Sequence, residues 1–210
     1  MTKTNSQKDI STFKNALAFW IPTSKEEKAI NIRSYLNGIN QVDEIWERLK
    51  DQFCDVLAVD SPHTFHPESF TYGELAENIS KAADAFSQLG VEPNDVVALF
   101  AENSPRWLIA DQSLMRLGAS DSVRGATAPP SELRYILEDS NAVGLIVQNS
   151  DVWKKLSLND KQINSLKFVI QLEGKACEGV FEWENFLLKG LNKEDVSKQE
   201  NRIKSKPTRI

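Results

Sequence analysis

Hydrophobic residues recur at helical spacing in the segment that follows Thr71. They fall on one face of a helix, and they are Leu75, Ile79, Ala82, Ala83, Phe86 and Leu89. Thr71 and Glu74 match a capping box, in which the threonine side chain accepts from a first-turn amide and the glutamate reaches back. Gly90 supplies a stop at the other end. This pattern predicts a helix over about residues 71–89.

Similar signals predict three more helices. Ser104 suits the cap and Pro105 the first position of a helix that we expect over about 105–117. Acids in the first turn of the segment Asp43–Leu49 favour a helix there, because negative charge is stabilised at a helix N-terminus. A further helix is expected after Pro129, where apolar residues again follow at helical spacing.

Short continuous apolar runs alternate with these helices. The runs predict strands near 56–60, 96–101, 143–147 and 167–170, and Ser122–Gly125 is expected to be a short strand end. Such runs are typical of strands that are buried on both faces of a parallel sheet. The alternation predicts an α/β fold, with at least three strands in a mainly parallel sheet flanked by helices. Residues 61–69 hold two prolines and both histidines and are expected to form a loop.

The pattern changes towards both ends of the chain and predicts three parts. Residues 1–40 are expected to be an N-terminal arm, 41–188 an α/β subdomain, and 189–210 a polar basic tail or truncated linker. Phe13, Leu17 and Trp20 form one short apolar stripe in the arm. We expect the arm to pack on the body of the protein, and an interfacial membrane helix is the alternative.

Composition and charge narrow the class of protein. With 40% hydrophobic and 26% charged residues among 210, the chain matches globular proteins and not collagen-like or disordered ones. The net charge of −5 argues against nucleic-acid binding through a broadly basic surface. No apolar run approaches the roughly 20 residues of a membrane-spanning helix. We therefore expect a cytoplasmic protein, with peripheral membrane contact as a further expectation.

Motifs of several common chemistries are absent from the sequence. It contains no G-x-x-x-x-G-K-[ST], no G-x-G-x-x-G and no G-x-S-x-G. His63 and His66 are expected in a surface loop and not at a metal ion, because nothing fixes a third ligand. Cys54 and Cys177 belong to no C-x-x-C pair; we expect two buried thiols, and a disulfide stays open.

The position rule for open α/β sheets points to one candidate site. Ligands bind such sheets beyond the carboxyl ends of the strands. In this chain that rule selects residues 101–104 and 124–127. Glu102 and Asp111 are acids near a strand end, although the sequence specifies no partner for either.

Several separated segments also occur in an order that is typical of one enzyme family. They are Phe70–Leu75, Leu89–Val91, Val96–Leu99, Glu102–Gln112 and Leu133–Ser140. These segments resemble the N-terminal part of AMP-forming acyl-activating enzymes, the superfamily of acyl-CoA synthetases, firefly luciferase and peptide-synthetase adenylation domains. Met115–Ala119 and Ser122–Gly125 are similar to its cyanobacterial and plastid branch of long-chain acyl-CoA or acyl-acyl-carrier-protein synthetases. The resemblance covers roughly residues 40–205.

The resemblance implies a two-step reaction. A fatty acid is converted by ATP into an acyl-adenylate with release of pyrophosphate, and the thiol of CoA or of acyl carrier protein then displaces AMP. ATP and magnesium are implied for the full-length relatives. The Ser/Thr/Gly-rich phosphate loop of the family has no counterpart in this sequence, which reads Lys206–Ile210 at its end. No catalytic, cofactor-binding or metal-binding residue of the family can therefore be carried over to a position here.

Two readings of the function follow. In the first, the chain is an N-terminal fragment of a fatty-acid-activating ligase, inactive alone, whose partner is the missing C-terminal part of the enzyme. In the second, it is a stand-alone, non-catalytic α/β interaction module. A small nucleotide-binding protein of flavodoxin type is disfavoured by the absent glycine loops.

Overall fold

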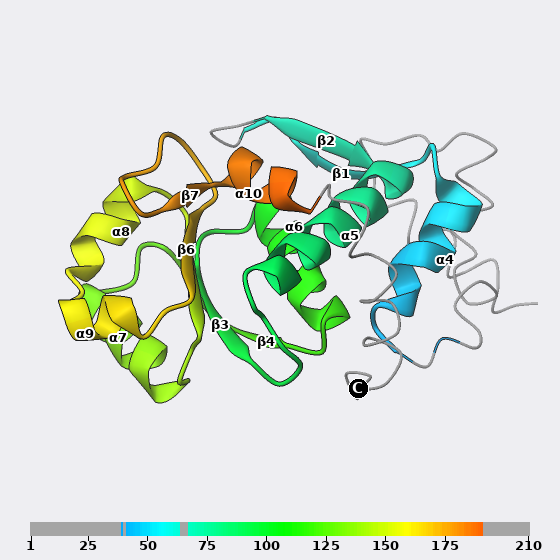
Figure 1. Cartoon of the computed structure of the whole chain (residues 1–210). Coiled ribbons are helices and arrows are strands. Elements are labelled where there is room, and N and C mark those ends of the chain that lie inside the picture. Colours follow the sequence, from blue (N-terminus) through cyan, green and yellow to red (C-terminus); the bar gives the residue numbers. More distant parts are fainter. Residues whose placement is uncertain (1–38, 40, 64–66, 191–210) are drawn as a thin grey trace, which may run out of the picture. The chain divides into compact units, whose positions relative to one another are not determined.

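The computed structural model describes residues 39, 41–63 and 67–190 (Figure 1). Nearly all of the predicted arm over residues 1–40, and of the predicted tail over 189–210, lies outside these residues. The division into arm, subdomain and tail therefore stays a prediction. Within the described residues, no helix has the length and apolar character needed to cross a membrane.

The centre of the described part is a sheet of five parallel strands. Its order is β4-β3-β5-β6-β7. The strands are β3 (Val96–Phe100), β4 (Ser120–Arg124), β5 (Gly144–Val147), β6 (Phe168–Gln171) and β7 (Phe181–Glu182). Each neighbouring pair is parallel, so every connection crosses over a face of the sheet. The predicted α/β class and mainly parallel sheet are confirmed.

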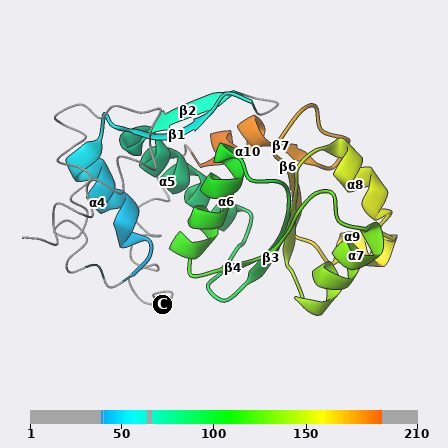
Figure 2. The ribbon, with the colours of Figure 1, turned by 180° about the vertical axis from the view of Figure 1, so that it is seen from behind.

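Helices cover both faces of this sheet, as Figures 1 and 2 show from opposite sides. On one face lie α5 (Tyr72–Gln88), α6 (Pro105–Arg116) and α10 (Trp183–Lys189). On the other lie α7 (Pro130–Asp139) and α8 (Ser150–Leu156), followed by the short helix α9 (Asp160–Asn164). β3, β5 and β6 are mainly apolar because neither of their faces meets water, whereas the edge strand β4 is polar and partly exposed.

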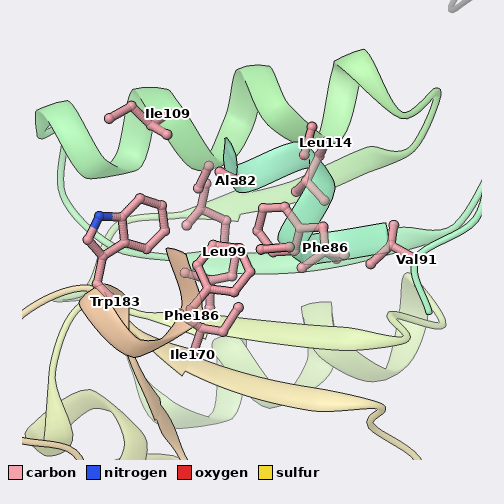
Figure 3. Close-up of a cluster of buried hydrophobic side chains, with 14 of the residues drawn as sticks. Ala82, Phe86, Val91, Leu99, Ile109, Leu114, Ile170, Trp183 and Phe186 are labelled. Atoms are coloured by element: carbon pink, nitrogen blue, oxygen red, sulfur yellow. The ribbon is translucent and has the colours of Figure 1, made fainter. Parts of the chain in front are cut away.

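Alternate residues of β3 supply two separate cores. Val97 and Leu99 face α5 and α6, whereas Ala98 and Phe100 face α7, and all four are fully buried. Figure 3 shows the first core, where the rings of Phe86 and Phe186 are 4.6 Å apart between centroids. Pairs of aromatic rings at this separation stabilise a core beyond the area that they bury.

Local capping signals decide where the two long helices begin. The Glu74 amide donates to Thr71 Oγ1 at 3.2 Å, and the Thr71 amide donates to Glu74 Oε2 at 2.9 Å. This is the predicted capping box of α5. At α6, the Trp107 amide donates to Ser104 Oγ at 3.1 Å, and Pro105 occupies the first turn. Both helices start where the sequence predicted.

The strand predicted near residues 56–60 forms, but it does not join the parallel sheet. β1 (Leu57–Ser61) pairs antiparallel with β2 (Glu68–Thr71) in a separate two-stranded sheet. Leu57 is 51% exposed, so the expectation of a buried strand is wrong, and part of the predicted 61–69 loop is strand. The hairpin ends at the cap of α5, and α4 (Glu44–Phe53) precedes it. Three of the four predicted strands lie in the parallel sheet.

Candidate functional site

The carboxyl ends of the parallel strands meet at one edge of the sheet, and polar residues follow three of them. Glu102 comes after β3, Gln148 after β5 and Glu173 after β6. The Glu102 amide donates to Gln148 Oε1 at 3.3 Å, and Gln148 Nε2 donates to Glu173 Oε2 at 3.3 Å. The side chain of Gln148 thus bridges the ends of strands that are not neighbours in the sheet. We call Glu102, Gln148 and Glu173 the carboxyl-edge cluster.

The structure brings the two predicted site segments together. A Cβ atom placed on Gly125 would lie 3.1 Å from Oε1 of Glu102, so the loop after β4 contacts the loop after β3. This separation is tighter than most contacts of a real Cβ, and a side chain at residue 125 would push the carboxylate aside. Glycine at this position therefore lets the Glu102 carboxylate approach the backbone closely.

Two cations near this edge are engaged by acids or carbonyl groups. Arg124 Nε donates to Glu132 Oε1 at 2.6 Å. Lys155 Nζ donates to the carbonyl of Ala126 and, at 3.1 Å, to that of Ala128. Glu102 and Glu173 meanwhile contribute negative charge to the edge. Polyphosphate binds to cations and free amides, and we assign these side chains no nucleotide contact.

Arg106 forms a second polar centre, next to the start of α6. It is 7% exposed, and its Nη1 donates to the carbonyl of Leu172 at 2.6 Å. Its Nε lies 2.9 Å from Glu68 Oε1 on β2, and its Nη2 lies 2.9 Å from Glu184 Oε1 on α10. Arg106 therefore joins the hairpin, α6, the end of β6 and α10. The sequence did not mark this residue, because its partners lie 38 or more positions away.

Gln171 is a buried polar residue at the end of β6, and the apolar run of that strand did not predict it. It is 1% exposed, and its Nε2 donates to the carbonyl of Glu173. Its Oε1 has no hydrogen-bond partner within the described part of the chain. A buried acceptor without a partner costs free energy, so Gln171 is a position of local destabilisation beside the carboxyl-edge cluster.

A pair of acids with strongly altered titration lies elsewhere, at the amino-terminal half of β4. Asp121 contacts Asp111 of α6, and burial together with that second carboxyl raises the pKa of Asp121 to about 7. Of the two acids named from the sequence, Glu102 therefore belongs to the carboxyl edge and Asp111 to this pair. Asp121 itself was missed, since only the crossover from α6 to β4 brings its partner near.

The structure describes one of the two histidines and both cysteines. His63 is exposed, and His66 lies outside the described residues. The part of the chain that is described holds no group of three potential ligands suited to a metal ion. Cys54 is exposed and Cys177 half-buried, both as free thiols, so the expectation of two buried thiols is wrong. Cys54 follows the end of α4 at the surface, between Phe53 and Asp55.

Comparison with known proteins assigns this fold to a family. The sequence profile of the AMP-binding enzyme family matches residues 46–204. The chain belongs to this family. AMP-binding enzymes similar to it include "Probable acyl-activating enzyme 16, chloroplastic" of Arabidopsis thaliana, 34% identical over 139 residues, or 66% of this chain and 19% of that protein. Another is "Long-chain-fatty-acid--[acyl-carrier-protein] ligase AEE15, chloroplastic" of the same plant, 34% identical over 134 residues, or 64% of this chain and 18% of that protein.

Solved structures of AMP-binding enzymes share the fold. The anthranilate CoA ligase AuaEII, in complex with anthranoyl-AMP, matches 81% of this chain and 29% of its own, with a TM-score of 0.61 and 19% identity. The NpsA N-terminal subdomain of Klebsiella oxytoca matches 74% of this chain and 34% of its own, with a TM-score of 0.52 and 22% identity. The chain spans about a fifth of the length of the curated plant relatives.

Proposed function

We propose that this chain forms the N-terminal α/β subdomain of an ATP-dependent ligase for long-chain fatty acids. The ligase would form an acyl-adenylate and transfer the acyl group to the thiol of CoA or of acyl carrier protein. The observation that carries the proposal is the family match over residues 46–204, together with 34% identity to a plant protein named as a long-chain fatty acid ligase. The five-stranded parallel sheet supports the same assignment.

In this proposal the chain contributes structure and not the reacting groups. Adenylate formation needs donors that hold and neutralise the phosphates of ATP in the transition state. The carboxyl-edge cluster instead presents Glu102 and Glu173, and the neighbouring cations Arg124 and Lys155 are already engaged. Because the sequence also lacks a phosphate-cradling glycine loop, we infer that the groups which bind ATP and magnesium lie outside these 210 residues. The 210-residue chain alone would then be inactive as a ligase.

The remainder of a ligase is the partner that this proposal requires. The plant relatives are about five times as long as the segment that they share with this chain. A non-catalytic interaction module is the alternative, and it would share the same fold without contributing to any ligase. The two differ in whether the α/β unit works when it is joined to the rest of an AMP-binding enzyme.

A segment exchange tests the proposal. Residues 46–204 would replace the matching segment of the chloroplast acyl-carrier-protein ligase, and ATP-dependent loading of long-chain fatty acids would be measured with both thiol acceptors. We expect the chimaera to retain loading, while the same ligase with the segment deleted loses it. A chimaera that is folded by circular dichroism and elutes as one species, yet loads neither acceptor, would contradict the proposal. The preferred acceptor would distinguish CoA from acyl carrier protein.

A further inference from the structure

The side chains of Asp111 and Asp121 meet between helix α6 and the strand β4. Asp111 is 7% exposed, and the carboxyl groups of the two residues are close enough to hydrogen-bond. Oδ2 of Asp121 is buried and has no partner among the described residues. Ionised carboxylates are acceptors only, so two of them can form a hydrogen bond with each other only if one carries a proton.

Two further hydrogen bonds connect this pair to helix α4. Gln112 Nε2 donates to Asp111 Oδ2 at 2.6 Å. Trp46 Nε1 donates to Gln112 Oε1 at 2.7 Å, across 66 positions of sequence. Because the Gln112 amide donates to Asp111 and accepts from the indole, a movement of the Asp111 side chain would turn the amide and alter its contact with Trp46. The series Trp46–Gln112–Asp111–Asp121 therefore links three elements of the fold.

We propose that Asp111 and Asp121 share one proton at neutral pH and form a pH-sensitive lock among β4, α6 and α4. With the proton present, the two carboxyl groups attract each other and the Gln112–Trp46 bridge is aligned. When the proton leaves, two like charges are in contact in a partly buried place, and their repulsion drives them apart. The lock is independent of any ligase activity.

The charged groups around the pair offer little compensation for a second negative charge. Asp121 is opposite Val97 on β3. Among the described strands, β3 is the only one that pairs with β4. Arg116, on α6, lies 3.0 Å from Glu47 of α4 through its Nη1 and also faces Asp43, so its charge is divided between other acids. At the far end of β4, Arg124 pairs with Glu132 of α7. Directly before β3, Asp95 pairs with Lys167.

The direction of the pH dependence follows from proton binding. The pKa of Asp121 rises from 3.8 to about 7 in the folded chain, because of burial first and of Asp111 second. The folded state then holds a proton that the unfolded state has released, and folding loses stability as pH rises from about 4 through 7. A shift of one pKa unit changes the folding equilibrium constant by up to about tenfold. The folding constant should therefore fall on the order of tenfold to a hundredfold between pH 5 and 8.

The test follows the Trp46 indole by NMR on the full 210-residue chain. Five tryptophans give five indole N–H signals, and Trp46→Phe identifies the one from Trp46. We expect this signal to shift between pH 5 and 8.5 with a midpoint near 7. The shift should be absent in Asp121→Asn, whose amide retains the shape without the titration. The signal of Trp183, which is 3% exposed on α10, should not follow the same curve.

Urea unfolding at pH 5 and pH 8 supplies the second readout. Asp121→Asn should lose the pH-dependent fall in the folding constant, while Asp139→Asn, at an exposed position on α7, should retain it. Should Asp121→Asn fail to fold, Asp111→Asn replaces it, and the midpoint of the Trp46 titration should then move to lower pH, because burial still raises the pKa of Asp121 but the second carboxyl is gone. A Trp46 signal that does not change with pH in the unaltered chain would overturn the proposal. So would a titration or a stability change that persists unaltered in the Asn variant.

Discussion

The guanidinium group of Arg106 fixes four segments that are distant in the sequence. It contacts Glu68 on β2, Glu184 on α10 and the carbonyl of Leu172 after β6, from its own place in the first turn of α6. Its planar fork donates in three directions at once, which the ammonium group of lysine cannot reproduce with the same geometry. Arg106 therefore contributes to stability by holding the hairpin and α10 against the sheet.

Replacing Arg106 by alanine should destabilise the chain by about 2–4 kcal/mol, because the change leaves a buried carbonyl and a partly buried carboxylate without their donor. Urea unfolding with a fixed m-value would measure the loss. Arg124→Ala is the matched control, since its ion pair with Glu132 is half exposed, and it should cost less than about 1 kcal/mol. Equal losses in the two variants would contradict this role for Arg106.

Contacts between residues distant in the sequence could not be predicted from the sequence, and Asp121 shows why. The sequence shows an acid in a short polar run before Val123, which is typical of an exposed position. Its burial and its contact with Asp111 arise only when α6 and β4 pack together. Glu102 is different, because the rule that sites lie beyond strand ends depends on topology alone and could place it correctly.

At the scale of elements, the start of α5 at Thr71 could be predicted from the sequence, because it depends on local contacts only. The two hydrogen bonds of the capping box join residues three apart. The pairing of β1 is the opposite case. Its partner β2 follows the Pro62–Pro67 segment, and nothing in the apolar pattern distinguished an antiparallel hairpin from a strand of the main sheet. Pairing of strands is decided by non-local contacts, and sequence pattern alone does not supply these.

Removal of the Thr71 side-chain oxygen should lower the free energy of unfolding, because it removes the cap of α5. Thr71→Ala is expected to cost about 1 kcal/mol in urea unfolding, since a first-turn amide then loses its acceptor. Thr71→Ser keeps the hydroxyl and should cost less than half as much. If the alanine and serine variants unfold at the same urea concentration, the capping box does not stabilise α5.

At the scale of the whole molecule, both edge strands of the main sheet, β4 and β7, have no outer neighbour among the described strands, and β4 is the longer of the two. β4 pairs with β3 alone, and Val123 near its end is 45% exposed. The large exposed hydrophobic residues in the described part lie on five different elements, at Leu57, Val123, Tyr135, Ile163 and Leu188. These residues do not lie on one shared element, and the edge of β4 is the place where we expect strand-to-strand association.

We predict that the purified chain self-associates through this edge and that Val123→Lys weakens the association several-fold. Lysine on an edge strand opposes pairing because two such edges would bring like charges together. Tyr135→Lys serves as the control, since this residue is 65% exposed but lies on α7. Sedimentation velocity over a range of concentrations measures the effect. A chain that is monomeric at every concentration, or an equal effect of both variants, would contradict the prediction.

We expect this chain to supply the fold of an AMP-binding enzyme's N-terminal subdomain without the groups that react. Carboxylate-dependent ATP–pyrophosphate exchange by the purified 210-residue chain tests this expectation most directly. With long-chain fatty acids and magnesium, we expect exchange at the level of the no-protein control, because the sequence has no phosphate-cradling glycine loop. Fatty-acid-dependent exchange that copurifies with the chain, from a host that lacks its own ligase, would contradict the claim.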